Sequence, residues 1–159
     1  RRFRALPSLE PLSAAGTSKA FPVTLTSWTL IPSWERAFAT AFARRMERLP
    51  IIIAGETSLA QLAALFKRAA LVIGTDNGPM HLAVAMDAPS AHLFGPVDAR
   101  AFGPWGDTAR HVVITSGLTC IPCNRLDYTA RELPDHPCVR LITERQVMEA
   151  VRQIVKRET

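Results

Sequence analysis

The sequence predicts an α/β fold in which a parallel sheet is flanked by helices. Residues 51–54 and 71–74 are short, continuous apolar runs, which is typical of strands that are buried on both faces. Each run is followed by a segment whose apolar residues recur at helical spacing. Because strands and helices alternate in short units, the pattern indicates βαβ repetition with right-handed crossovers.

Further elements extend this alternation in both directions. Ser33 and Ser58 are plausible N-caps of two helices, the first of which carries an aromatic stripe that we assign to the core. Thr143 and Gln146 have the spacing of a capping box at the start of the last helix. Residues 91–94 and 111–114 are expected to be strands. The polar turn at residues 75–78 should lead into a helix that ends at about residue 86.

The beginning of the chain has a different character. Residues 1–32 are punctuated by prolines and indicate one strand at most, so we divide the chain into an irregular segment, 1–32, and a Rossmann-like domain, 33–159. A chain of 159 residues has room for one domain of ordinary size. No apolar run approaches the roughly 20 residues that span a bilayer, and no secretory signal is recognisable, so we expect a cytoplasmic location.

The charge of the chain does not by itself identify a partner. The formal net charge of +5 could attract phosphates, or it could serve only solubility. The basic residues are dispersed, and no dense basic run is interleaved with aromatic residues. Nucleic acid is therefore not an expected partner.

The turn between the strand at 71–74 and the following helix is the candidate ligand site. Ligands of open parallel sheets bind where strands end and helices begin. Gly78 permits a tight turn or a close approach of a ligand, and His81 could donate a hydrogen bond to a phosphate. Asp76 could cap the helix, accept from a sugar hydroxyl or act through a cation. The alternative is an ordinary capped turn, because no G-x-G-x-x-G or Walker pattern accompanies it.

Three ordered segments, at residues 54–65, at 71–83 and at 93–96 with 102–104, resemble glycosyltransferase family 9, the ADP-heptose:lipopolysaccharide heptosyltransferases. Residues 54–65 are similar to the family's AGKTSLxELAALI segment, and residues 71–83 to its VVGNDTGPMHLAAA signature. Residues 93–96, with 102–104 after them, are similar to its LFGPTDP…GP loop. The similarity is nearly continuous from about residue 50 to 155. It implies the C-terminal, donor-binding half of a GT-B architecture, in which two Rossmann-like domains face each other across a cleft.

The resemblance also implies which residues bind the nucleotide sugar. In the family, the aspartate, glycine and histidine of the signature lie at this ligand, and they correspond to Asp76, Gly78 and His81. Asn77 replaces the usual threonine and keeps a side-chain oxygen for capping or hydrogen bonding. Met80 precedes the histidine, as in the family, and either packs in the core or contacts adenine.

A second, partial match lies upstream, at residues 16–22. This stretch resembles a shortened form of the family's phosphate-binding loop, in which Thr17 and Ser18 would donate hydroxyls and Lys19 a charge to the pyrophosphate. The alternative is a terminal loop without a ligand. The family's acidic, ribose-contacting residue is not recognisable in residues 23–32.

Four potential metal ligands lie in a loop-rich segment near the C-terminus. Cys120, Cys123, His136 and Cys138 would suffice for tetrahedral zinc. The H-x-C spacing is tighter than usual for zinc, and the family carries a similar loop without a known metal requirement. We therefore favour structural thiols over zinc or a disulfide, and we expect no cofactor.

For the whole enzyme, the resemblance implies an inverting transfer of heptose from ADP-heptose, or a related nucleotide sugar, to the lipopolysaccharide inner core. The acceptor is a lipid-linked core oligosaccharide, which is compatible with peripheral association at the inner face of the inner membrane. No general base is identified, because in such enzymes it comes from the N-terminal domain. We therefore expect the acceptor-binding half to be absent and the isolated chain to be inactive. Alternatives are a non-catalytic nucleotide-binding module, a truncated fragment, or a metal-stabilised interaction domain.

Overall fold

The computed structural model covers the central and C-terminal parts of the chain, apart from short gaps. The residues that it describes are 37, 39–41, 43–46, 50–125, 127–129, 131–132, 136–138 and 140–157. The predicted boundary between residues 32 and 33 lies outside them, as do Trp34, Phe38 and Phe42 of the predicted aromatic stripe.

A parallel sheet forms the centre of the fold. It consists of β1 (Val72–Thr75), β2 (Ser90–Leu93) and β3 (His111–Ile114), in the order β1-β2-β3. Both pairings are parallel, and Val72 of β1 lies opposite Ser90 of β2, which lies opposite His111 of β3. The predicted α/β class with a parallel sheet is confirmed.

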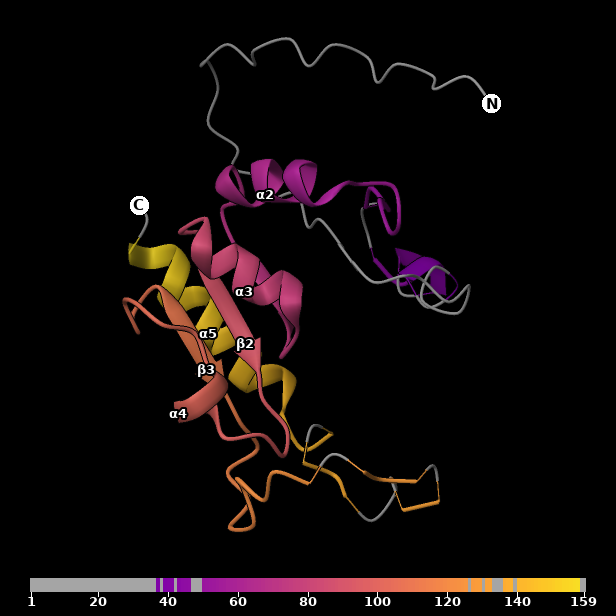
Figure 1. Ribbon diagram of the computed structural model, residues 1–159, viewed down its shortest axis with the longest axis vertical. Helices are drawn as coiled ribbons and strands as arrows, with labels where there is room; N and C mark the ends of the chain where they lie inside the picture. The colour runs from indigo at the N-terminus through magenta and orange to yellow at the C-terminus, as the bar shows by residue number, and fades with distance from the viewer. Residues whose placement is uncertain are drawn as a thin grey trace, which may run out of the picture.

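Helices cover the two faces of this sheet (Figure 1). The helix α3 (Gly78–Ala85) contacts β1 and β2, and α2 (Leu59–Lys67) packs on α3. On the opposite face, α5 (Glu144–Arg157) contacts β2 and β3. The short helix α4 (Ala99–Phe102) follows β2.

Each face carries its own hydrophobic core, because successive strand side chains point to opposite faces. The core under α2 and α3 consists of Leu62, Phe66, Val72, Met80, Ala83 and Ala88. The core under α5 consists of Ala91, Ile114, Ala150 and Ile154. The central strand β2 is thus enclosed between two packed layers.

Two of the predicted helix starts are confirmed by reciprocal capping bonds. At α2, the Gln61 N–H donates to Ser58 Oγ over 3.3 Å, and the Ser58 N–H donates to Gln61 Oε1 over 2.8 Å. At α5, Thr143 and Gln146 make the same pair of bonds, over 3.3 and 2.8 Å. These local patterns determine where the two helices begin.

The N-cap of α3 is Asn77 and not Asp76, although both were possible caps from the sequence. The Met80 N–H donates to the side-chain oxygen of Asn77 over 3.0 Å, so Asn77 is the N-cap. The expectation that Asp76 caps this helix is wrong. Asp76 lies one residue too early, and its carboxylate contacts His81 instead.

The strand predicted at residues 51–54 is not part of the described sheet. Only Ile52 makes an isolated bridge, and the Ile51 side chain is 74% exposed. The chain turns immediately afterwards, where Gly55 has φ of +73° and the Glu56 N–H donates to the Ile53 carbonyl over 3.0 Å. An apolar run this short is compatible with several environments, and tertiary contacts decide among them.

Upstream, residues 37, 39–41 and 43 are helical, and Ala39 and Ala43 are buried. Across the described ranges, no helix combines the length and the apolar character that crossing a membrane requires.

We expect Asn77→Ala to lower the free energy of unfolding by about 1 kcal/mol, because the Met80 N–H would lose its capping acceptor. Urea denaturation followed by circular dichroism measures this change. Asn77→Asp, which keeps an acceptor oxygen, is the matched control and should remain close to the parent. A larger loss in Asp76→Ala than in Asn77→Ala would contradict the assignment of the cap.

Candidate functional site

The candidate site lies at the edge of the sheet where the parallel strands end. The carboxyl end of β1 leads through Asp76 and Asn77 into α3, and the carboxyl end of β2 leads into the loop of residues 94–98. Thr75 and Leu93, the last residues of these strands, are register partners. Both connections therefore lie at the same edge, where ligands of such sheets bind.

An accessible pair of ionisable side chains stands at the start of α3. His81 Nε2 lies 3.5 Å from Asp76 Oδ1, and the two side chains are 44% and 27% exposed. His81 is in the first turn of the helix, where the helix dipole favours an anion. The pair thus combines a donor that can reach an anionic ligand with an acceptor for hydroxyl groups.

Two backbone N–H groups of this helix end, those of Met80 and His81, bond to Asn77 and are not free for a ligand. Pro79 has no N–H, and the Met80 N–H is directed to Asn77 Oδ1 over 3.0 Å. The His81 N–H donates to the Asn77 carbonyl over 3.3 Å. The His81 side chain and the helix dipole remain to favour an anion at this turn.

Two glycines have different roles in this turn. A Cβ on Gly74 would come within 2.6 Å of Met80 Sδ, so Gly74 makes room for the Met80 side chain. Met80 is only 3% exposed and belongs to the core under α3, which supports the packing interpretation of this residue. A Cβ on Gly78 would meet nothing within 4 Å, so Gly78 faces open space at the start of the helix.

A buried polar group that sequence reasoning missed lies within the sheet, where β2 and β3 begin. Ser90 Oγ lies 2.8 Å from His92 Nε2 and 2.8 Å from His111 Nδ1. The serine hydroxyl has a single hydrogen, so if it donates to one ring, the other ring must donate to it. Each of the apolar runs at 91–94 and 111–114 contains one histidine, which could have indicated a buried polar contact. Only the strand register shows that both rings meet the same serine.

Burial strongly affects the ionisation of these rings. Desolvation, followed by the nearby His111 and His81, lowers the pKa of His92 to about 4. Burial is also the main cause that lowers the pKa of His111. His92 is only 1% exposed, and both rings are therefore neutral near pH 7.

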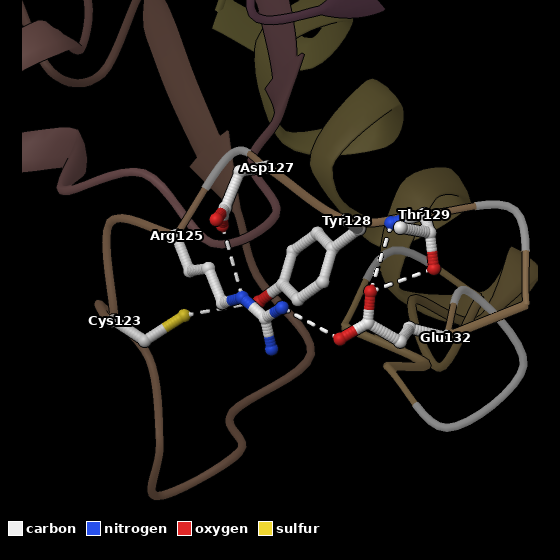
Figure 2. Close-up of polar contacts among 6 residues, drawn as sticks. All are labelled: Cys123, Arg125, Asp127, Tyr128, Thr129 and Glu132. Atoms are coloured by element: carbon white, nitrogen blue, oxygen red, sulfur yellow. Dashed lines mark hydrogen bonds and ion pairs between the residues drawn. The ribbon is translucent and has the colours of Figure 1, made fainter.

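The segment after β3 carries a second network, also missed from the sequence (Figure 2). Arg125 pairs with Asp127 over 3.0 Å and with Glu132 over 2.6 Å. Glu132 also accepts from the N–H and the hydroxyl of Thr129, over 3.0 and 2.7 Å. The Thr129 bonds, with Arg125 after them, lower the pKa of Glu132 to about 2.

Tyr128 lies at the centre of this network, as Figure 2 shows. The Arg125 guanidinium lies 4.8 Å from the centre of the Tyr128 ring. The ring centres of Tyr128 and His136 are 4.2 Å apart. The Tyr128 hydroxyl is 3.4 Å from Cys123 Sγ. This hydrogen bond is the main cause that lowers the pKa of the Cys123 thiol and raises that of Tyr128 to about 12.

The four potential zinc ligands, whose cysteines we assigned to structural thiols rather than to zinc, are not grouped as a metal site. All three cysteines have free thiols, and within the described part of the chain no three His, Cys, Asp or Glu residues are grouped so that they could hold a metal ion. Cys123 contacts Tyr128, whereas Cys138 Sγ is 3.8 Å from the His136 carbonyl. Thr17, Ser18 and Lys19 lie outside the described residues, so the upstream phosphate loop stays a prediction.

We expect acid to destabilise the fold through His92. The unfolded ring, with a pKa of about 6.5, takes up a proton that the folded ring, with a pKa of about 4, does not. The contribution of His92 to the free energy of unfolding is therefore fully present above about pH 6.5. It is lost as the pH falls, so that the protein is less stable by about 2 kcal/mol at pH 5. Urea denaturation at several pH values measures this. His92→Gln should show a shallower pH dependence, and an unchanged one would contradict this role of His92.

We expect Tyr128→Phe to raise the pKa of the Cys123 thiol, because the thiolate loses its hydrogen-bond donor. The measurement is the rate of iodoacetamide alkylation against pH, in a chain that carries Cys120→Ser and Cys138→Ser. The midpoint of the profile should move to higher pH than in the same chain with Tyr128. Identical midpoints would show that the tyrosine does not activate the thiol.

Comparison with known proteins identifies the family. The family model described as glycosyltransferase family 9 (heptosyltransferase) matches residues 24–132. Lipopolysaccharide heptosyltransferase 3 of Escherichia coli (strain K12) is 42% identical over 64 residues, which cover 40% of this chain and 19% of that protein. Lipopolysaccharide heptosyltransferase 1 of Pseudomonas aeruginosa is 31% identical over 100 residues, which cover 60% of this chain and 27% of that protein.

A solved structure shows the same fold. The crystal structure of the glycosyl transferase family 9 from Veillonella parvula DSM 2008 aligns with a TM-score of 0.63 at 23% identity, over 79% of this chain and 35% of that one. The chain thus spans about a fifth to a third of the length of these relatives. The family model covers more than half of the chain, and its match includes the strands, α3 and the turn with Asp76 and His81. The chain therefore belongs to glycosyltransferase family 9, the heptosyltransferase family.

Proposed function

We propose that this chain forms the donor-binding part of a heptosyltransferase that acts in the synthesis of the lipopolysaccharide inner core. The donor would be ADP-heptose or a related nucleotide sugar. The observation that carries the proposal is the exposed His81–Asp76 pair at the start of α3, at the edge where β1 and β2 end. This pair lies within the segment that the family model matches.

The pair suits a diphosphate sugar because it offers two kinds of hydrogen bond. His81 would donate to a diphosphate oxygen, and an imidazolium could donate to Asp76 at the same time. Asp76 would repel a bare phosphate, so its ligand is expected to be a hydroxyl of the sugar or ribose. Asn77 and Gly78 would hold and line the turn, and Thr17, Ser18 and Lys19 would add donors for the pyrophosphate.

The reaction would break the bond between the anomeric carbon and the diphosphate while the acceptor hydroxyl attacks from the opposite side. Negative charge then grows on the departing diphosphate. His81 and the helix dipole would stabilise that charge, because preorganised donors and dipoles need no rearrangement during the reaction. We propose that this enzyme is inverting, and that the general base and the residues that hold the acceptor lie outside this chain, in the other half of a GT-B architecture.

On this proposal, the chain alone would bind donor without turning it over. The acceptor would be a lipid-linked core oligosaccharide, met at the cytoplasmic face of the inner membrane with a peripheral association. Turnover by the isolated chain would show that the base lies within these residues. Binding without turnover, even when the other half is supplied, would favour the alternative of a nucleotide-binding module.

We expect His81→Ala to weaken ADP binding roughly ten- to a hundredfold, because a charge-assisted hydrogen bond to the diphosphate is lost. Calorimetric titration with ADP, UDP and ADP-heptose measures this, and circular dichroism checks that the variant is folded. Arg152→Ala, which removes an exposed positive charge from α5, is the control and should bind as the parent does. An unchanged ADP affinity in His81→Ala would contradict the assignment of His81 to the diphosphate.

A further inference from the structure

Asn124 connects the segment after β3 to the loop that follows β2. The Asn124 N–H donates to the Pro96 carbonyl over 2.8 Å, and the Asn124 side-chain oxygen accepts from the Asp98 N–H over 2.9 Å. The two bonds hold the main chain of the loop on both sides of Val97. A single residue therefore fixes this loop from a position 26 residues further along the chain.

The bond to the Asp98 N–H has a specific structural reason. Asp98 is the N-cap of α4, and its side chain accepts from the Arg100 N–H over 2.9 Å. In a complete capping box, the side chain of the third helical residue also accepts from the N-cap N–H, as Gln61 does at α2. The third residue of α4 is Ala101, which has no acceptor. Asn124 supplies the missing acceptor from outside the helix.

The backbone of Asn124 restricts which residues can do this. Its φ is +54°, in the left-handed region that Asn, Asp and Gly tolerate best. Of these three, Asn and Asp carry a side-chain oxygen. The position thus needs both the unusual backbone and an acceptor, and Asn meets both needs without adding a charge.

The loop that Asn124 holds begins at the same edge of the sheet as the candidate site, because Thr75 and Leu93 are register partners. Its first residue, Phe94, is buried, and the Phe94 N–H donates to the Ile114 carbonyl over 2.9 Å, so the core fixes the near end of the loop. Asn124 fixes the far end. The neighbouring connection, from β1 to α3, carries Asp76 and His81. The position of this loop beside the connection that carries Asp76 and His81 therefore depends on Asn124.

We propose that Asn124 is a positioning residue for the donor site, which holds the 94–98 loop in the conformation that binds the nucleotide sugar. This inference rests on the proposed function, because it assigns a role in that same site. It also gives the segment with Cys123, Arg125 and Tyr128 a function, namely to carry Asn124 to the loop. Asn124 acts through its two hydrogen bonds to the loop.

The test compares three substitutions in the full chain. Asn124→Gly keeps the left-handed backbone and removes the acceptor, Asn124→Asp keeps both, and Asn124→Ala loses the acceptor and strains the backbone. The readouts are amide hydrogen exchange at Asp98, the calorimetric Kd for ADP and the melting temperature. Because the added charge of Asn124→Asp could itself repel ADP, that variant is assessed by exchange alone.

We expect Asn124→Gly to speed exchange at Asp98 and to weaken ADP binding roughly three- to tenfold, at a temperature where the chain remains folded. Asn124→Asp should keep the slow exchange, and Asn124→Ala should in addition lower the melting temperature. This pattern would support the proposal, because a residue needed only for the turn would be replaced by Gly without loss.

Two results would overturn the proposal alone: parental ADP affinity in Asn124→Gly, or unchanged exchange at Asp98 in that variant. Failure of the parent chain itself to bind ADP would instead overturn the proposed function, and the positioning role with it. The parent titration therefore distinguishes the two failures.

Discussion

The enclosure of β2 is the constraint on which the rest of the structure depends. This strand is paired along both edges and is packed by α3 on one face and by α5 on the other. Ala91 meets the core under α5, whereas Ser90 and His92 face the other way. Polar groups at such positions are tolerated only with internal partners, and His111 on the next strand supplies one. The position of β2 thereby sets the register of the whole sheet.

The same packing determines the direction of the candidate site residues. Met80 and His81 are consecutive in α3, so their side chains project about 100° apart around the helix axis. Met80 is held in the core beside Gly74, which leaves His81 directed toward Asp76 and solvent. A helix whose inward side is anchored in this way presents its outward side with little freedom. The exposed histidine is therefore positioned by the buried, apolar side chain of its neighbour, Met80.

Much of the fold could be predicted from the sequence because its signals are local. The capping boxes at Ser58 and Thr143 depend on residues three apart, and the strand at 111–114 was predicted with its observed limits. The run at residues 51–54 has the composition of a buried strand, yet composition does not specify a partner, and the described sheet excludes it. The sequence offered both Asp76 and Asn77 as caps of α3, and the structure selects Asn77, because both residue types cap well and only the backbone decides between them.

The family could also be predicted, since ordered motifs are specific, whereas the supporting networks could not. The contact between Ser90 and His111 spans 21 residues, and the bond from Asn124 to Asp98 spans 26. Such contacts depend on register and on loop conformation, for which a single sequence carries no signal. The ligands of His81 and Asp76 stay predictions for a different reason: the accessibility of a side chain does not specify what it binds.

The sharing of one serine hydroxyl between two imidazoles has a spectroscopic consequence. One ring nitrogen must carry a hydrogen that points at Ser90 Oγ, and His92 and Ser90 are shielded from water. A ring N–H in such a setting exchanges slowly with solvent, so its proton resonance persists downfield of the amide region. Because the group exists only when β2 and β3 are paired in register, that resonance is a label-free reporter of whether the centre of the sheet is assembled.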